Sequence, residues 1–218
     1  MLKSFMQFIG EAVIRPYDFD QELEELLGRE ALSIEDMNLA LGKYGVSFVG
    51  VDEFIESLET DKERSLVPIE MPPLFGGVRW GAHNVYNDAI YVCIDADQFT
   101  VALNKDRERL FGFLREVLRH ESIHREQAGR RRHIKIRNLE NSPTDPKRYF
   151  SSTDEIMAYA DSFIVQARDR GLSDDQILDA LAHGKRVSWI QGVYSKLDPK
   201  SVNRFRKYVY QYLQESGD

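Results

Sequence analysis

One run of apolar residues at helical spacing, between Asn104 and Gly129, constrains the fold of this chain more than any other feature. The apolar positions recur every three or four residues, at Leu110, Phe113, Leu114, Val117 and Leu118. This period is typical of a helix with one face against a core. Asn104 is the expected N-cap, and Gly129 is the expected end. The sequence therefore predicts a long amphipathic helix over residues 104–129.

The second half of this helix carries the pentapeptide His120-Glu121-Ser122-Ile123-His124, which reads H-E-x-x-H. On a helix, residues at i and i+4 lie one turn apart on the same face. Two imidazoles in that relation can share one Zn²⁺ at about 2.0–2.1 Å. Glu121 then points to the side of the pair, where it can take a proton from water without being a ligand. The spacing predicts a zinc site with His120 and His124 as ligands.

The rest of the chain is expected to be mixed. Helices are predicted at Asp18–Leu27, Ser33–Gly42, Asp52–Glu59, Ser152–Arg170, Ser173–His183 and Asp198–Gln214. Strands are predicted at Val46–Val51, Leu66–Met71, Gly77–Trp80 and Ala89–Ile94, and residues 130–149 form a loop. Short runs of β-branched and aromatic residues between turn residues favour strands, and Gly171 and Gly184 suit helix ends.

A zinc site needs a third protein ligand and an open fourth position to be catalytic. Glu155 is the best candidate, because it opens the next predicted helix among small residues; Asp154 is the next candidate. The alternative for Glu155 is a capping box with Ser152, in which its carboxylate bonds the cap backbone. His133 and His183 are alternative ligands. His133 is expected to be exposed, and His183 to act as a C-terminal cap.

His120-Glu121-Ser122-Ile123-His124 and the segment Glu155-Ile156-Met157-Ala158-Tyr159-Ala160 together resemble the gluzincin branch of the zincin-like metallopeptidases. The resemblance covers roughly residues 85–165. Gln127 and Arg130 stand where the metzincin branch has glycine and histidine, which excludes that branch. The resemblance implies an α+β zincin-like fold, with a small mostly antiparallel sheet packed on the helix of residues 104–129 and a largely helical C-terminal half.

The same resemblance implies how such a site acts on a peptide or protein substrate. Glu121 is the general base and then the general acid, and Zn²⁺ polarises the scissile carbonyl. The strand near Tyr91 forms the sheet edge beside the cleft, able to pair with an extended peptide. Tyr149, Tyr159 and His183 are candidates for a further donor to the oxyanion; for Tyr159, plain packing is the alternative.

Residues 1–12, Met1-Leu2-Lys3-Ser4-Phe5-Met6-Gln7-Phe8-Ile9-Gly10-Glu11-Ala12, carry a second pattern. They resemble the capsid-targeting peptide of internal head proteins in large myovirus-type tailed phages, which the prohead protease cuts after the glutamate. The resemblance implies a phage-encoded protein that acts in the host cytoplasm or is packaged in the virion, with capsid and prohead protease as partners. The alternative is an amphipathic helix that docks on the domain.

Composition limits the remaining function classes. The net charge of −7 argues against a general nucleic-acid binder. The basic cluster at Arg125, Arg130, Arg131, Arg132, Lys135 and Arg137 is expected to be a solvated helix end, with nucleic acid or an acidic substrate as the alternative. The one cysteine, Cys93, indicates a reducing compartment. No membrane span and no secretory signal peptide are expected.

The expected organisation is a targeting peptide at 1–12, a helical segment at 13–63, and a zincin-like domain with C-terminal helices at 64–218. Three hypotheses follow. The first is a zinc-dependent peptidase. The second is a virion or internal head protein that keeps a zincin-like fold with little or no catalysis. The third is a closed zinc site that only joins helices, so that chelation melts the fold.

Overall fold

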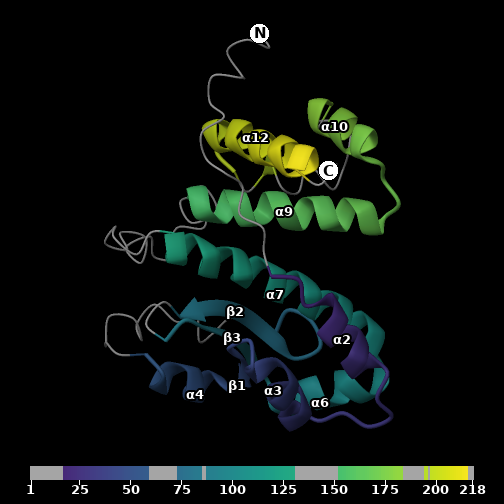
Figure 1. The fold of residues 1–218 in the computed structure, drawn as a ribbon, viewed down its shortest axis with the longest axis vertical. Helices are drawn as coiled ribbons and strands as arrows, with labels where there is room; N and C mark the ends of the chain where they lie inside the picture. Colours follow the sequence, from purple (N-terminus) through teal and green to yellow (C-terminus); the bar gives the residue numbers. More distant parts are fainter. Residues whose placement is uncertain are drawn as a thin grey trace. The chain divides into compact units, whose positions relative to one another are not determined.

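The computed structural model describes residues 17–58, 73–84, 87–130, 152–183, 194–195 and 197–215 (Figure 1). The chain divides into two compact units. One, Pro16–Phe150, is called the sheet unit; the other, Ser151–Asp218 together with Met1–Arg15, is called the helical unit. The fold is α+β with mostly helical content, as predicted. Among the described residues, no helix is both long and apolar enough to cross a membrane.

The sheet unit holds three short helices before its central strands. They are α2 (Asp20–Leu27), α3 (Ile34–Gly42) and α4 (Val51–Glu56). At α3, Ser33 accepts a hydrogen bond from the Asp36 backbone N–H, and the Asp36 carboxylate accepts one from the Ser33 N–H. This capping box depends only on residues three positions apart, and it begins the helix where the sequence predicts one from Ser33.

The sheet has the strand order β1-β3-β2, with β1 (Val46–Val49), β2 (Val78–Asn84) and β3 (Ala89–Ile94). β1 pairs parallel with β3 and β2 pairs antiparallel with β3, so the expectation of a mostly antiparallel sheet is wrong: the sheet is mixed. The strand near Tyr91 is the central strand rather than the edge, because β1 occupies its other side. Among the described strands, β1 and β2 are therefore the two edge strands, and β2 is the edge strand that pairs antiparallel with β3.

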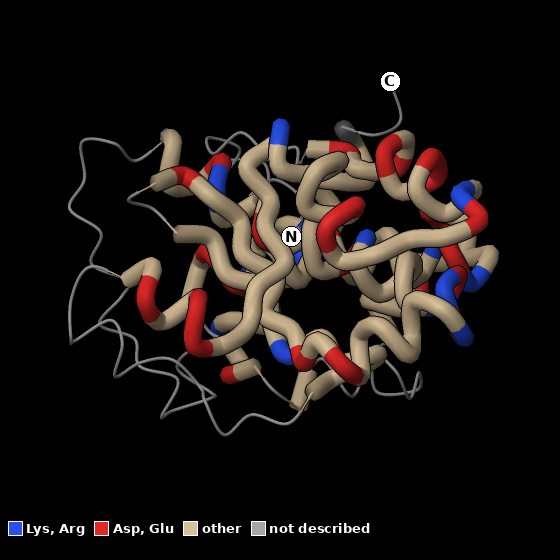
Figure 2. The backbone as a smooth tube through the Cα atoms, turned by 90° about the horizontal axis from the view of Figure 1, so that it is seen from below, with Lys and Arg blue, Asp and Glu red and all other residues tan. Residues whose placement is uncertain are grey.

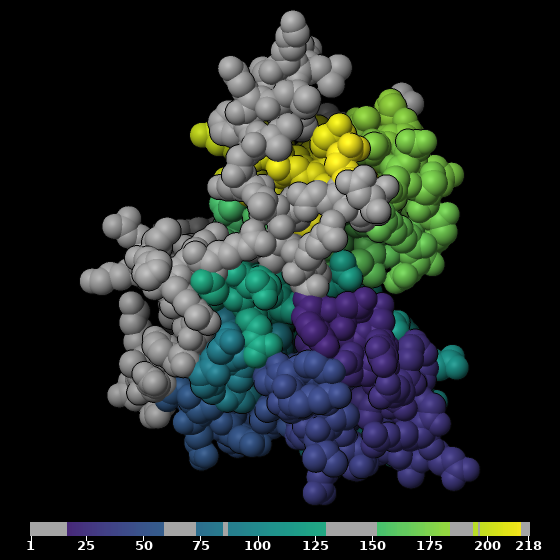
Figure 3. Space-filling model, viewed as in Figure 1, coloured from purple at the N-terminus to yellow at the C-terminus, as the bar shows by residue number. Residues whose placement is uncertain are grey.

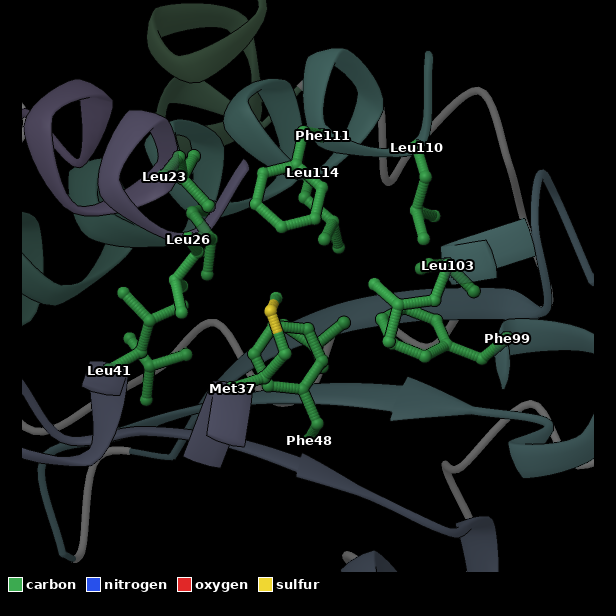
Figure 4. Packing of buried hydrophobic residues seen from close by; sticks show 14 of the residues in the cluster. Leu23, Leu26, Met37, Leu41, Phe48, Phe99, Leu103, Leu110, Phe111 and Leu114 are labelled. Carbon is green, nitrogen blue, oxygen red and sulfur yellow. The ribbon is translucent and has the colours of Figure 1, made fainter. Parts of the chain in front are cut away.

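β3 is buried on both faces, which explains its continuous apolar sequence. Its residues Ile90, Val92 and Ile94 enter the main core, and Cys93 enters a smaller cluster with Val49 and Phe54 of α4. The main core lies between the sheet and four helices, which are α2, α3, α6 (Ala96–Lys105) and α7 (Arg107–Arg130). Figure 4 shows side chains from these helices converging on Phe48 of β1. Each fully buried side chain of this size contributes about 1.5–3 kcal/mol.

The predicted long helix is interrupted near its start. The structure has α6 (Ala96–Lys105) and then α7 (Arg107–Arg130), with Asp106 between them at φ −142° and ψ 45°. Asn104 is therefore not an N-cap; it lies inside α6, where its side-chain amide donates to the Thr100 carbonyl. Asp95 is the cap instead, accepting from the Gln98 N–H at 3.1 Å directly after β3. The helix that carries the pentapeptide begins at Arg107 and includes Gly129.

Surface residues of the sheet unit fit its acidic composition. Figure 3 shows α2 (purple) and α3 (blue) side by side on the viewed face. Tyr44, just after α3, donates a hydrogen bond to the Glu22 carboxylate of α2. Figure 2 shows acidic and basic positions interspersed along the described backbone. Arg115 of α7 makes ion pairs with Asp20 and Glu24 of α2, which tie the middle of α7 to that helix.

The helical unit consists, in its described part, of α9 (Thr153–Asp169), α10 (Asp174–Ala182) and α12 (Pro199–Glu215). These match the predicted helices. Ser173 and Gln176 form a capping box, and Gly171 takes φ +77° just after α9. Phe163 of α9 packs edge-to-face on Phe205 of α12, with ring centroids 5.3 Å apart. The predicted strand Leu66–Met71, the loop 130–149 and residues 1–12 lie outside the described residues, apart from Arg130 in the last turn of α7.

Candidate metal centre

The structure places the pentapeptide on α7, with both histidines on one side of the helix. Nε2 of His120 lies 3.1 Å from Nε2 of His124, and the two half-buried rings meet at 78°. Tetrahedral zinc with Zn–N bonds of about 2.0–2.1 Å separates two ligand nitrogens by roughly 3.3 Å. The two nitrogens thus already converge on one point at nearly this separation. A cation bound there would replace the proton that these nitrogens share.

Gln127 fixes which nitrogen of His124 is available. Its side chain is only 3% exposed, and its Oε1 lies 3.0 Å from Nδ1 of His124. With the amide oriented in this way, Nδ1–H donates to Gln127 and Nε2 keeps its lone pair. Metal-binding histidines are commonly held in one tautomer by such a partner. In the sequence, Gln127 serves only to exclude the metzincin branch. Its position three residues after His124 was the signal for this second role.

Glu121 is seated against the edge strand. Its side chain is buried, with 8% exposed, and it lies over Gly81 in the middle of β2. A Cβ added at Gly81 would come within 2.7 Å of Glu121 Cγ and 3.0 Å of its Oε1, and within 2.7 Å of Val117 Cγ1. α7 therefore approaches β2 this closely only because position 81 has no side chain.

The negative charge of Glu121 affects the pKa of Cys93 in β3. Burial, and after it the negative charge of Glu121, raise the pKa of the Cys93 thiol to about 12. Cys93 is fully buried and is therefore a neutral thiol at neutral pH. A thiolate ligand at this position is thus not part of the candidate site, and the donors near Glu121 on α7 are the two imidazoles.

The other predicted site residues that the structure describes on α9 belong to the helical unit. Glu155 is in the first turn of α9 in the helical unit, where its backbone N–H donates to Ser152 Oγ at 3.3 Å and its side chain is 6% exposed. Asp154 and Tyr159 are on the same helix. His120, Glu121 and His124 belong to the sheet unit, so the role of Glu155 as third ligand and that of Tyr159 as oxyanion donor stay predictions.

Of the alternative histidines, the structure describes only His183. His183 is the C-cap of α10, and its Nδ1 lies 3.1 Å from the Asp179 carbonyl oxygen and 3.0 Å from the Asp179 carboxylate. This is the capping role that the sequence predicts. His133 and Tyr149 lie outside the described residues. Comparison of the chain with protein-family models, with curated proteins and with solved structures finds no match.

Proposed function

We propose that this chain is a zinc-dependent peptidase with a zincin-like fold. The observation that carries the proposal is the pair of Nε2 atoms of His120 and His124, 3.1 Å apart on one helix, with Glu121 buried next to them. Two further contacts support it: Gln127 holds the tautomer of His124, and Gly81 makes room for the carboxylate of Glu121. A helix surface with no metal role needs none of these arrangements.

The ligands in this proposal are His120, His124 and Glu155. Glu155 suits the role because it is a buried carboxylate in the first turn of α9, and a carboxylate is a common zinc ligand. Zn²⁺ held by these residues would supply a Lewis acid for the scissile carbonyl and for the attacking water.

The remaining steps belong to side chains of the protein. Glu121 accepts the proton of the attacking water and later gives it to the leaving amine, and its burial limits exchange of that proton with solvent. Tyr159 lies one helical turn after Glu155 on α9, so the two side chains share one face. From that position, its phenol is the candidate donor to the oxyanion.

The first test is the substitution Glu121→Gln, which keeps the size and hydrogen bonding of the side chain but removes the base. We expect the variant to bind one Zn²⁺ per chain as the wild type does, and to lose hydrolysis of denatured casein and of quenched fluorescent peptides by about 10²–10⁴-fold. The matched control is Glu126→Gln, an exposed glutamate on the same helix, which should leave the rate unchanged. Equal rates for the Glu121→Gln variant and the wild type would refute the mechanism.

The second candidate function is a virion or internal head protein with little or no catalysis. It rests on the resemblance of residues 1–12 to a capsid-targeting peptide, and these residues lie outside the described part of the chain. Capsid and prohead protease would be its partners. Tight zinc binding together with no hydrolysis of any peptide in the same assays would favour this function over the first.

A further inference from the structure

We propose that Arg125 is a positioning residue for the metal centre: it anchors the ligand-bearing end of α7 to the backbone of two turns of the sheet unit. The inference rests on the proposed function, because it assigns Arg125 a role in holding the histidine pair for metal. From the sequence, Arg125 is expected to belong to the basic cluster at a solvated helix end. In the structure its side chain is only 22% exposed, and it is directed to carbonyl oxygens.

The guanidinium of Arg125 bonds two segments at once. Nη1 donates to the Tyr44 carbonyl at 2.7 Å, in the turn between α3 and β1. Nε donates to the Asp88 carbonyl at 3.1 Å, and Nη2 donates to the same oxygen, in the turn between β2 and β3. The planar fork of arginine makes several such bonds in a fixed geometry, which lysine does not. Arg125 thus links α7 to the turn before β1 and to the turn between β2 and β3.

Two residues at the turns that Arg125 contacts, Gly45 and Asp88, have a left-handed backbone conformation. Gly45 has φ +71°, and a Cβ there would lie 2.5 Å from Arg125 Nη2. Asp88 also has a left-handed backbone, with φ 56°. The two turns are joined to each other, since the Ile90 N–H donates to the Gly45 carbonyl at 2.8 Å. Left-handed residues other than glycine are uncommon and mark positions that the surrounding structure holds.

His83 of β2 contacts the side chain of Asp88, one of the two residues that Arg125 bonds. Its side chain is 3% exposed and its Nε2 lies 3.1 Å from Asp88 Oδ1. Burial lowers the pKa of His83, so the neutral ring donates its Nε2–H to the carboxylate, which keeps its charge toward Arg125. Strand alternation puts His83 on the same face as Gly81, which supports Glu121. α7 is therefore held at two places: Glu121 lies against Gly81 of β2, and Arg125 bonds Asp88, which His83 of β2 contacts.

Arg125 directly follows His124, so anchoring it sets the rotation and the height of the last turns of α7. Small displacements of a ligand lower metal affinity and disturb coordination geometry, as the loss of other supporting groups does. Arg115, ten positions earlier on the same helix, is the natural comparison. It also ties α7 to the rest of the sheet unit, through ion pairs with Asp20 and Glu24, but it lies away from the histidines in the sequence.

The experiment compares Arg125→Ala, Arg125→Lys and the control Arg115→Ala in the full chain. Each protein is loaded with Co²⁺, whose visible absorption reports coordination geometry, and its affinity is measured against a competing chelator. We expect Arg125→Ala to bind Co²⁺ about 10–100-fold more weakly with an altered spectrum, Arg125→Lys to restore this only in part, and Arg115→Ala to match the wild type. Added guanidinium ion should restore the Arg125→Ala spectrum. A spectrum and affinity equal to the wild type in Arg125→Ala would overturn the inference.

A second measurement separates this inference from the proposed function. In the metal-free proteins, the ring nitrogens of His120 and His124 report their tautomers by NMR. If the wild type binds no divalent cation, the proposed function fails, and a tautomer change in Arg125→Ala still supports the positioning of the pair. If the wild type binds metal and Arg125→Ala leaves tautomers, spectrum and affinity unchanged, the proposed function stands and the role of Arg125 is rejected.

Discussion

At the scale of single residues, the candidate site depends on partners that hold the reactive groups. His120 and His124 provide the two nitrogens, but Gln127 decides that Nε2 is the nitrogen of His124 that carries no proton. Glu121 and the two histidines were predictable because all three belong to one helical turn and its neighbour. Gln127 was visible in the sequence, yet only its burial and its contact with the ring indicate its role.

Replacement of Gln127 should weaken metal binding without removing a ligand. In Gln127→Leu, His124 Nδ1–H loses its acceptor and the ring its preferred tautomer, so we expect zinc affinity to fall about 10–100-fold. Gln127→Glu keeps an acceptor and should retain the affinity. The measurement is a titration against a competing chelator, with the exposed Glu126→Leu as control. Affinity in Gln127→Leu equal to that of the control would mean that Gln127 has no part in the site.

At the scale of elements, the candidate site depends on the packing of α7 against β2. The pairing of β2 with β3 sets Gly81 opposite Val92, on the sheet face that enters the main core. This places the bare backbone of β2 under Glu121 and brings His83 to the end of the same strand, beside Asp88. The helix was predicted from its period. Its contact with β2 was not, because sequence patterns give which face is apolar but not which strand it meets.

A methyl group at position 81 should disturb this contact. In Gly81→Ala, the added Cβ would overlap with Glu121 Cγ and Val117 Cγ1, so we expect a loss of about 1–3 kcal/mol in unfolding free energy. Peptidase activity should fall by more than stability alone explains, since Glu121 is displaced. The control is Gly112→Ala in α7, where nothing lies within 4 Å and alanine should stabilise the helix by about 0.5–1 kcal/mol. Urea unfolding of both variants tests this, and a Gly81→Ala protein as stable and active as the wild type would contradict it.

At the scale of the whole molecule, the proposed ligand set draws on both compact units. His120 and His124 belong to the sheet unit, and Glu155 belongs to the helical unit. A metal that binds the folded chain and not the unfolded chain also contributes its binding energy to stability. The two units were not predicted as such. Their boundary follows from the contacts each unit makes within itself, and these are not visible in composition or hydropathy.

The third ligand is tested by Glu155→Gln. The Ser152 cap uses the backbone N–H of Glu155, so this substitution leaves the start of α9 in place and removes only the carboxylate charge. We expect a larger loss of zinc affinity than in Gln127→Leu, while Asp154→Ala retains the metal. Zinc content after dialysis and chelator competition give the result. Full retention of zinc in Glu155→Gln, with loss in Asp154→Ala, would move the ligand to Asp154.

The sequence by itself determined what depends on neighbours within four residues: the helix boundaries set by Ser33, Ser173 and Gly171, and the pairing of His120 with His124. These features follow from the repeat of the helix and from local hydrogen bonds. The tertiary structure alone decided the mixed strand order of the sheet, the position of Gly81 beneath Glu121, and the hydrogen bonds of Arg125. Arg125 bonds Tyr44, which is 81 residues earlier in the chain, and Asp88, which is 37 residues earlier. Such contacts are fixed by which elements pack together, and packing depends on the shape of the whole core rather than on any local pattern.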